Sequence, residues 1–543
     1  MSAQSVSNIR VVTPLELSRH ASETDCWIAV DGIVYDVSKF MKLHPGGKSV
    51  ILSVGGRDVT EAFFSYHKKE VLTKYSDKLK IGVLEGSTQL PLHDLTCEFD
   101  TYTPFAESGF VRGWFSPYMN DSHKKFRADC RKIMAKHVYP VVEQLHERGS
   151  DPSDELFEAL GKAGMLAARG GPYMMPFVKR LGIPLPGGVP PDSFDYFHEM
   201  IAIDELYRTG SGGVSDGLGT GITIGLIPVA LFGNKELKTR VVPSVLLGKT
   251  RCCLAITEPQ TGSDVSGLTS TAKLNAEGTH YIVNGIKKWI TGSGSSSPTI
   301  YTTAVRTGGP GHNGISLLLI EDPKSASEGT ITKHKIKTSY SGAAGTSLLI
   351  FENVLVPREN LLGQENQAFK LIGMNFNHER WYICCISAAF ARNCLAECYR
   401  WAIQRKAFGK RLIDQPVIRY KLAEMSAITE CMEAWIESLT YQMTQMSPAE
   451  QFEKLAPAIA LCKFASTRYG VKLADNACQI FGGRAVTRTG MGRVIEAFKN
   501  EVKFAAILGG SEEILADLAV RQAVGACDRT VKRKPEARVM ARL

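Results

Sequence analysis

Two short segments decide the fold: Glu379-Arg380 and, 26 positions further on (405 − 379), Arg405-Lys406-Ala407-Phe408-Gly409. Both segments lie in a region of long helical periodicity that begins after Gln367. A glutamate directly before an arginine is most often part of an ion pair on a helix surface, so its meaning depends on its surroundings. Two further segments narrow the choice: the run Ala255 to Asp264 upstream and the glycine pair Gly509-Gly510 downstream.

The pattern around these segments changes from helical to strand-like and back to helical. Residues 105–250 are mainly helical, with amphipathic spacing from His123 to Leu145 and from Glu155 to Leu166. Residues 251–366 carry short β-like runs between glycine and polar turns, namely Ile300–Val305, Ile315–Ile320 and Ser347–Phe351. Long helical patterns return over residues 367–525.

This order of patterns, together with the quoted motifs, resembles the acyl-CoA dehydrogenases over roughly residues 105–525. The resemblance implies a helical N-terminal domain, a middle β domain and a C-terminal four-helix domain. With the smaller unit described below, the expected fold class is a multidomain α+β protein.

The resemblance also implies that the chain binds FAD, and it assigns roles to single residues. The segment Ala255–Asp264 is similar to the family's flavin loop, in which Thr257 and Ser263 would contact the isoalloxazine edge and Gly262 would permit a close approach. Trp289-Ile290-Thr291 looks like the strand whose tryptophan covers the flavin and whose threonine bonds near N5. A tryptophan alone is more often a core residue, but the two motifs together favour the cofactor role.

Further FAD contacts are expected across a subunit interface. By resemblance, the residues that reach a neighbouring subunit's cofactor are Arg405, Phe408, Gln415, Gln479, Gly482 and Gly483, and those at further cofactor positions are Ser511 and Glu513. An arginine suits a diphosphate because its planar guanidinium can donate two hydrogen bonds at once. The expected assembly is therefore a homodimer or homotetramer.

The carboxylate that would take a proton from the substrate is not at its usual place. Many family members carry it at the start of a Glu-Gly-Thr segment, whereas this chain reads Ile507-Leu508-Gly509-Gly510-Ser511. The long-chain and isovaleryl-type members carry the glutamate on a facing helix, before an arginine and 26 positions ahead of the R-x-x-F-G arginine. Glu379 meets both conditions, so the expected base is Glu379 and the main chain of Gly509 would bind the thioester oxygen. Ser263 and Arg380 are also expected to contact the substrate.

Residues 8–84 form a separate compact unit in the sequence. Short β-like runs, Trp27–Val30 and Ile33–Val37, flank a predicted turn at Asp31-Gly32. Residues 85–104, which follow, are polar and without periodicity, and this composition predicts a linker.

Two histidines give this unit its expected chemistry. His44-Pro45-Gly46-Gly47 predicts a turn whose glycines allow a flat macrocycle to approach the main chain, and His67 follows 23 positions later (67 − 44). Two imidazoles on opposite faces of a haem iron would fill both axial sites, which suits electron transfer rather than oxygen chemistry. In this context the segment resembles cytochrome b5, which implies haem b held by His44 and His67.

The composition agrees with several globular units and excludes other classes. The 543 residues are 44% hydrophobic, and much of the net charge of +9 lies in residues 526–543, which look like a solvated basic tail. No basic patch with interleaved aromatics indicates nucleic-acid binding. The longest mostly apolar stretch, Ile222–Phe232, is too short to span a membrane. Thirteen cysteines without C-x-x-C spacing favour buried, reduced thiols over zinc or disulfides.

The end of the sequence predicts a location. Ala541-Arg542-Leu543 resembles the small-basic-leucine address of peroxisomal proteins, and no convincing presequence precedes the N-terminal unit. The expected location is the peroxisome, with the mitochondrion and the cytosol as alternatives.

The leading functional expectation is FAD-dependent dehydrogenation of an acyl-CoA to a 2-enoyl-CoA, with the haem unit or another protein as electron acceptor. Two alternatives stay open at this point. One is a flavin-dependent oxidase or monooxygenase on the same fold, and the other is a catalytically inactive electron-transfer or binding protein. The chain length and branching of the acyl group are not readable from the sequence.

Overall fold

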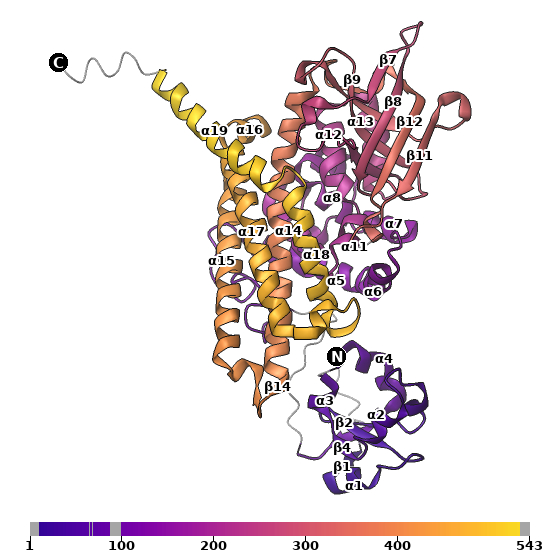
Figure 1. The fold of residues 1–543 in the computed structure, drawn as a ribbon, viewed down its shortest axis with the longest axis vertical. Coiled ribbons are helices and arrows are strands. Elements are labelled where there is room, and N and C mark those ends of the chain that lie inside the picture. The colour runs from indigo at the N-terminus through magenta and orange to yellow at the C-terminus, as the bar shows by residue number, and fades with distance from the viewer. Residues whose placement is uncertain (1–9, 65, 68, 87–98, 341, 533–543) are drawn as a thin grey trace, which may run out of the picture.

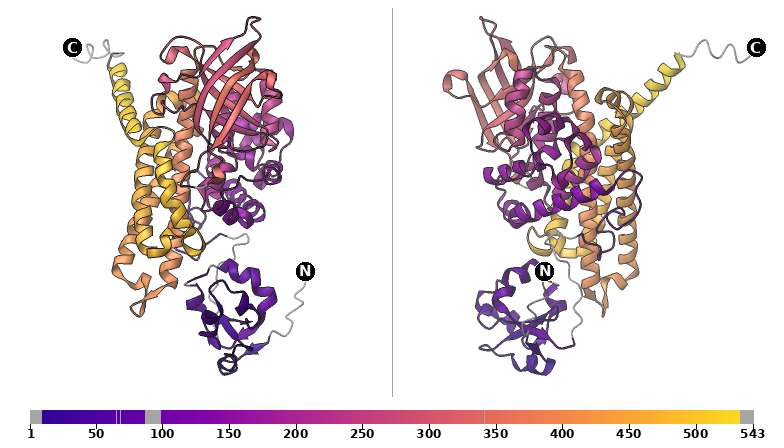
Figure 2. Two further views of the ribbon diagram at one scale, coloured as in Figure 1. Left: turned by 45° about the vertical axis from the view of Figure 1, so that its right-hand side comes forward. Right: turned by 180° about the vertical axis from the view of Figure 1, so that it is seen from behind.

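The computed structural model describes residues 10–64, 66–67, 69–86, 99–340 and 342–532. They form a small N-terminal unit and a larger body, in which a β-sheet and a helical layer lie along one flank of a long-helix bundle (Figures 1 and 2). The expected address Ala541-Arg542-Leu543 and most of the expected linker, residues 87–98, lie outside the described residues.

The N-terminal unit is built on a five-stranded sheet with the order β1-β5-β3-β2-β4. Its strands are β1 (Val11–Val12), β2 (Trp27–Val30), β3 (Ile33–Asp36), β4 (Arg57–Asp58) and β5 (Lys80–Leu84), and its helices are α1 (Pro14–Arg19), α2 (Lys48–Leu52), α3 (Thr60–Phe64) and α4 (Lys69–Leu79). The predicted turn joins β2 to β3. Asp31 and Gly32 both have positive φ angles, 53° and 72°, as a two-residue hairpin requires.

The helical layer comprises α5 (Asp121–His137), α6 (Tyr139–Arg148), α7 (Asp154–Lys162), α8 (Met165–Arg169), α9 (Met175–Leu181), α10 (Tyr196–Tyr207), α11 (Gly212–Gly217), α12 (Ile227–Phe232) and α13 (Lys235–Leu246). Each of the two expected amphipathic runs is divided into two helices. The first divides at Val138, because Pro140 in the first turn of α6 has no N–H with which to continue α5. The second divides at Gly164, whose φ of 76° is left-handed.

The middle β domain is an eight-stranded sheet with the order β11-β12-β8-β7-β9-β10-β13, in which β6 pairs with β9. Its strands are β6 (Arg251–Ala255), β7 (Thr271–Leu274), β8 (His280–Ile290), β9 (Thr299–Arg306), β10 (Ile315–Glu321), β11 (Thr330–Lys335), β12 (Ser347–Pro357) and β13 (Leu361–Leu362). The three predicted β-like runs are confirmed as β9, β10 and the first part of β12.

The bundle consists of α14 (Ala368–Gln404), α15 (Pro416–Thr444), α16 (Pro448–Lys454), α17 (Ala456–Phe481), α18 (Arg493–Ile507) and α19 (Glu512–Lys532). Helices α14, α15, α17 and α18 stand side by side, and α19 leaves the bundle at its upper end in Figure 1. A two-stranded hairpin, β14 (Lys406–Ala407) and β15 (Lys410–Arg411), projects from the lower end. Since α19 extends to Lys532, residues 526–532 of the expected basic tail are helical.

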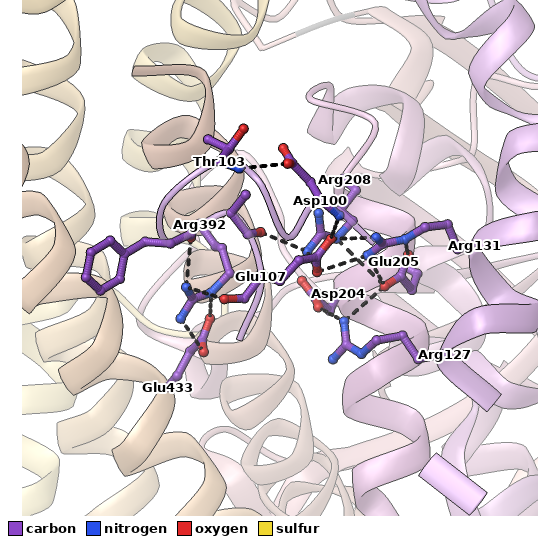
Figure 3. A network of polar contacts seen from close by, with 12 residues as sticks. Asp100, Thr103, Glu107, Arg127, Arg131, Asp204, Glu205, Arg208, Arg392 and Glu433 are labelled. Atoms are coloured by element: carbon purple, nitrogen blue, oxygen red, sulfur yellow. Dashed lines mark hydrogen bonds and ion pairs between the residues drawn. The ribbon is translucent and has the colours of Figure 1, made fainter. Parts of the chain in front are cut away.

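A buried ionic network holds the helical layer against the bundle (Figure 3). Glu107, which is fully buried, binds the guanidinium of Arg131 from α5 at 2.5 Å. Arg392 of α14 donates to the main-chain carbonyl of Phe105 at 2.9 Å. Removing one partner from such a network leaves a buried charge without its counter-ion, so the network fixes how the two layers meet.

The expected fold class is confirmed, with a small α+β unit followed by a helical domain, a β domain and a helical bundle. Residues 99–104, the described end of the expected linker, pack into the larger body, where Asp100 is 1% exposed and accepts a hydrogen bond from Arg400 at 2.7 Å. Among the described residues, no helix combines the length and apolarity needed to cross a membrane.

Candidate functional site

Glu379 lies in the first third of α14, where it is 6% exposed. Its Oε2 atom has no hydrogen-bond partner among the described residues. Burial raises the pKa of this carboxyl group to about 7, although Arg380, Lys463 and His378 favour its ionised form. A buried carboxylate with an unbonded oxygen and a pKa near neutrality has the properties of a general base.

Gly509 faces Glu379 from the turn between α18 and α19. A Cβ atom at position 509 would lie 3.6 Å from the Glu379 Oε1 atom. The expected base and the expected oxyanion-binding glycine thus lie together in the structure. The turn also needs glycine, because φ is 66° at Gly509 and 105° at Gly510.

Two cations fix this turn from either side. The Arg380 Nε atom donates to the Gly509 carbonyl at 3.0 Å, and the Lys463 Nζ atom donates to the carbonyls of Ala506 and Gly510 at 3.0 and 2.8 Å. Burial lowers the pKa of Lys463 to about 8. From the sequence, Arg380 is expected at the substrate, whereas Lys463 is not among the expected site residues. The available signal was a lysine on the buried stripe of α17, four residues after Ile459.

The expected flavin residues gather where the loop after β6 meets the end of β8. The Lys288 N–H donates to the Thr257 carbonyl at 2.9 Å, which ties the loop to the strand. Trp289 has a φ of 66° and is 53% exposed, although it is a large apolar residue at a strand end. An exposed tryptophan in a strained conformation fits a surface that covers a flat cofactor.

The other expected residues of this loop border the same surface. Gly262 and Ser263 are exposed, and a Cβ atom at Gly262 would meet nothing within 4 Å, so the space beside it is open. Thr291 is a hydrogen-bonding neighbour of the Tyr340 hydroxyl, which also lies 3.1 Å from Thr346 Oγ1. The Thr291 side chain is therefore held at the edge of the site by a buried tyrosine.

Beneath the flavin loop lies a buried ion pair that sequence analysis missed. The Lys287 Nζ atom is 2.8 Å from Glu258 Oε1, and neither side chain is more than 1% exposed. Glu258 also accepts the main-chain N–H groups of Thr269 and Ser270 at 2.7 and 2.9 Å. Burial opposes ionisation of Glu258, but Lys287 and these donors together lower its pKa to about 2. The Glu258 carboxylate therefore joins the beginning of the flavin loop to the main chain at Thr269 and Ser270.

The sequence pattern of β8 indicates that Lys287 is buried. In β8 the buried residues Tyr281 and Val283 alternate with more exposed neighbours, and Lys287 has the same parity. A charged residue on the inward side of a strand requires a partner, and Glu258 in the adjoining loop is that partner.

The residues expected to reach a neighbouring subunit lie at the lower end of the bundle. Phe408 and Gly409 form the tip of the β14–β15 hairpin, with φ angles of 54° and 73°, and Phe408 is 97% exposed. Arg405 and Gln415 flank this hairpin. The Trp401 indole N–H donates to the Ile480 carbonyl at 3.2 Å, which brings the end of α14 beside the exposed residues Gln479, Gly482 and Gly483.

This group lies far from the base in its own chain. Glu379 and the end of α14 at Gln404 are separated by about 38 Å of helix, at 1.5 Å for each residue. Ser511 and Glu513, by contrast, follow Gly509 directly at the start of α19, and Glu513 is exposed. The expected cofactor residues thus form three groups, which lie at the loop after β6 with the end of β8, at the start of α19 after the Gly509 turn, and at the hairpin.

His44 and His67 meet in the N-terminal unit, with ring centres 5.9 Å apart. Two imidazoles that bind one iron from opposite sides place their ring centres about 6 Å apart, so the spacing fits a single metal between them. A Cβ atom at Gly46 would lie 2.8 Å from the His44 ring, which accounts for the glycine there. Burial, with His44 nearby, lowers the pKa of His67 and favours the neutral imidazole that binds iron. The residues present therefore fit haem.

His123, Asp195 and His198 also bring three potential metal ligands together. Asp195 caps α10 by accepting the N–H groups of Phe197 and His198, and the two histidine rings complete the capping boxes of α5 and α10. Because these atoms already complete the two helix ends, we assign the group a structural role.

Family models match three parts of the chain. Residues 13–85 match the cytochrome b5-like haem/steroid binding domain, residues 253–354 the acyl-CoA dehydrogenase middle domain and residues 366–524 the acyl-CoA dehydrogenase C-terminal domain. Acyl-CoA dehydrogenase apdG of Emericella nidulans is 39% identical, and the match covers 80% of this chain and 98% of the relative. The mitochondrial long-chain specific acyl-CoA dehydrogenase of Rattus norvegicus is 28% identical, covering 75% and 87%.

Solved structures agree with these matches. The acyl-CoA dehydrogenase of Bacillus anthracis complexed with FAD is 26% identical, with a TM-score of 0.66 over 77% of this chain and 70% of that one. Butyryl-CoA dehydrogenase of Megasphaera elsdenii shares the fold, with a TM-score of 0.64 at 24% identity over 76% of this chain and 100% of that one. The chain belongs to the acyl-CoA dehydrogenase family and carries a cytochrome b5-like domain on the N-terminal side of its FAD-dependent dehydrogenase fold.

Proposed function

We propose that the protein dehydrogenates an acyl-CoA thioester with Glu379 as the base. The observation that carries this assignment is the unbonded, buried Oε2 atom of Glu379 beside position 509, where the usual family carboxylate is replaced by glycine. Glu379 removes a proton from the carbon next to the thioester carbonyl, and the product is a 2-enoyl-CoA. Bound FAD supplies the acceptor for the hydride that leaves the β carbon.

The turn at Gly509 supplies the second part of the chemistry. A proton next to a carbonyl becomes acidic enough only when the carbonyl oxygen is polarised. We assign that task to the main-chain N–H of Gly509, because Arg380 and Lys463 bind the carbonyls of the same turn and hold its orientation. Arg380 thereby acts on the substrate through the main chain.

The cofactor contacts divide between two subunits in this proposal. The flavin end is bound by Thr257, Gly262, Ser263, Trp289 and Thr291, together with Ser511 and Glu513. The residues at the hairpin reach the FAD of a neighbouring subunit, which the exposed Phe408 and the length of α14 support. A homodimer or homotetramer follows, and light scattering of the purified holoenzyme tests it. A monomer with full FAD content would contradict the proposal.

The haem domain is the proposed first electron acceptor. The Arg484 guanidinium lies 5.3 Å from the ring centre of Tyr66, the residue before His67, and 4.9 Å from that of Trp401. Tyr66 therefore meets the bundle beside Gly482 and Gly483, in the segment assigned to FAD. Bound haem b supplies a one-electron carrier at this place, whereas substrate oxidation delivers two electrons.

An anaerobic titration with a panel of acyl-CoAs tests the proposed function. Flavin bleaching followed by haem reduction supports dehydrogenation with internal transfer, and the best substrate gives the chain length. Flavin bleaching without haem reduction would mean that the haem exchanges electrons with another partner. Stoichiometric peroxide under air would favour the oxidase or monooxygenase alternative, and bound FAD that no acyl-CoA reduces would favour the inactive one.

We also propose a peroxisomal location and a role in fatty acid β-oxidation, on the basis of Ala541-Arg542-Leu543. A fluorescent reporter carrying residues 526–543 should enter peroxisomes, and the same reporter without Leu543 should stay in the cytosol. Equal distribution of the two reporters would contradict the peroxisomal assignment.

A further inference from the structure

A chain of buried hydrogen bonds begins on the helix of the proposed base. Tyr382 lies three residues after Glu379 on α14, and residues at this spacing share one side of a helix. The Tyr382 hydroxyl accepts a hydrogen bond from the guanidinium of Arg169 and lies 3.0 Å from the Tyr207 hydroxyl. The Tyr207 hydroxyl donates to Asp216 Oδ1 at 2.5 Å. The core next to the base is therefore polar on this side.

This network leaves one oxygen of Asp216 for a ligand. Thr220 Oγ1 also donates to Asp216 Oδ1, at 2.8 Å, so this one oxygen accepts two hydrogen bonds. Among the described residues, no hydrogen bond reaches the Oδ2 atom, although Asp216 is only 6% exposed. Asp216 lines a small cavity of about 20 Å³, whose wall also includes Gly219, Gly292 and Ala344. This volume has room for one water-sized group.

The cavity lies between the proposed flavin site and α18. Gly292 of its wall directly follows Thr291, which is expected near the flavin N5. On the other side, α11 packs against α18, because a Cβ atom at Gly212 would lie 1.4 Å from Glu501 Oε1. Glu501 precedes the Gly509 turn by eight positions (509 − 501), or about 12 Å of helix. An acyl chain held at Gly509 by its carbonyl oxygen can thus reach this cavity with its far end.

A hydroxyl group suits the acids at this place. Glu501 is 3% exposed, and its Oε2 atom has no hydrogen-bond partner among the described residues. Burial raises the pKa of Glu501 well above its ordinary value, and it also raises the pKa of Asp216. A hydroxyl group donates to an ionised carboxylate and accepts from a protonated one, so it satisfies Asp216 in either form. An alkyl end does neither and leaves the buried oxygen unpaired.

We propose that the cavity at Asp216 holds the far end of the acyl chain and selects a terminal hydroxyl group, so that the substrates are ω-hydroxyacyl-CoA thioesters. This inference rests on the proposed function, which places the reacting carbons at Glu379. Asp216 determines the specificity, and Tyr207 and Thr220 fix its orientation through Oδ1. The small volume of the cavity leaves no room for carbons beyond the hydroxyl group.

The test uses pairs of acyl-CoAs in which a terminal hydroxyl group replaces a methyl group of equal size. The pairs are ω-hydroxyhexanoyl-CoA with heptanoyl-CoA, ω-hydroxyoctanoyl-CoA with nonanoyl-CoA, and ω-hydroxydecanoyl-CoA with undecanoyl-CoA. The measurement is the second-order rate constant for anaerobic flavin reduction by the wild-type holoenzyme. At one chain length the hydroxylated member should react about 10–100-fold faster than its alkyl partner. Equal rates, or a faster alkyl member in every pair, overturn the inference.

Variants at the cavity assign the preference to a residue. Asp216→Leu removes the hydrogen-bonding group, so the preference should disappear, whereas Asp216→Asn keeps a polar amide there and should still favour the hydroxylated member. Thr223→Val is the control, because the Thr223 hydroxyl donates to the Arg169 main-chain carbonyl at 3.0 Å, outside the network. It should keep the wild-type preference. A preference that survives Asp216→Leu unchanged overturns the role of Asp216. The wild-type panel decides the inference even where a variant does not fold.

Binding to the Glu379→Gln holoenzyme separates this inference from the proposed function. Isothermal titration calorimetry with the same pairs needs no proton abstraction, and the hydroxylated member should bind about tenfold more tightly at the preferred chain length. Equal dissociation constants in every pair overturn the selectivity, whatever the base. If Glu379→Gln still reduces its flavin at the wild-type rate, the proposed base is wrong, while the binding preference stands or falls by itself.

Discussion

The pH dependence of the first chemical step follows directly from the burial of Glu379. Only the ionised carboxylate can accept the substrate proton, and burial raises its pKa to about 7. About one tenth of the enzyme then carries an ionised base at pH 6 and about nine tenths at pH 8. The second-order rate constant for flavin reduction should therefore rise about tenfold between these values and level off above pH 8.

Anaerobic stopped-flow measurement at limiting acyl-CoA is the suitable assay, because these conditions report the ionisation of the free enzyme. Reduction of the same enzyme by dithionite needs no base and serves as the control. A profile that is flat from pH 6 to 8, or whose acid limb lies near the ordinary glutamate value, would refute the reasoning from burial.

The same group links pH to stability with a definite sign. Folded Glu379 keeps its proton up to a pKa of about 7, whereas in the unfolded chain it ionises near the ordinary glutamate value of 4.5. The unfolded state binds fewer protons in this window, so stability falls as pH rises from about 4.5 to 7, by about 3 kcal/mol in total. Glu379→Gln removes this loss. The variant should therefore unfold at a higher temperature than the wild type at pH 8, and an equal or lower midpoint would count against the raised pKa.

Three further outcomes follow from single contacts. Lys287→Met should cost about 3–5 kcal/mol of stability and release FAD, because it leaves Glu258 buried without its cation. Adding Glu258→Gln should restore much of this loss, as measured by thermal unfolding. An unchanged unfolding midpoint in the single variant would argue against the ion pair. Gly509→Ala should lower stability by about 1–2 kcal/mol through its positive φ and should slow flavin reduction, and wild-type kinetics would show that the turn tolerates a side chain. His44→Ala should abolish the haem absorbance, whereas His20→Ala should retain it, and haem retained by the first variant would remove His44 as a ligand.

Motif spacing predicted the parts of this protein that depend on local sequence. The turn at Asp31-Gly32 needs two residues that tolerate positive φ, and the chain provides them. The switch from helical to β periodicity placed β9 and β10 within about one residue of their bounds. Helix ends were less predictable. Amphipathic spacing passes through Pro140 and Gly164 without a break, while the main chain does not.

The site was predictable only where a motif carried it. The loss of a carboxylate at Gly509 and the gain of one at Glu379 are visible in the sequence. Their closeness depends on how α14 packs against the α18–α19 turn, where a Cβ atom at position 509 would lie 3.6 Å from Glu379 Oε1. Lys287 binds a carboxylate that is distant in the sequence, and Lys463 binds main-chain carbonyls. No local sequence pattern therefore identifies either partner. Tertiary contacts of this kind appear only in the folded chain.

The central claim is that Glu379 takes the substrate proton, and single-turnover flavin reduction by the Glu379→Gln holoenzyme tests it most directly. The variant is isosteric, so FAD content and acyl-CoA binding should match the wild type. With the best acyl-CoA of the panel, the rate of flavin bleaching should fall by about 10²–10⁴-fold, the usual contribution of a general base. Bleaching at the wild-type rate by the FAD-loaded variant would contradict the claim and place the base elsewhere.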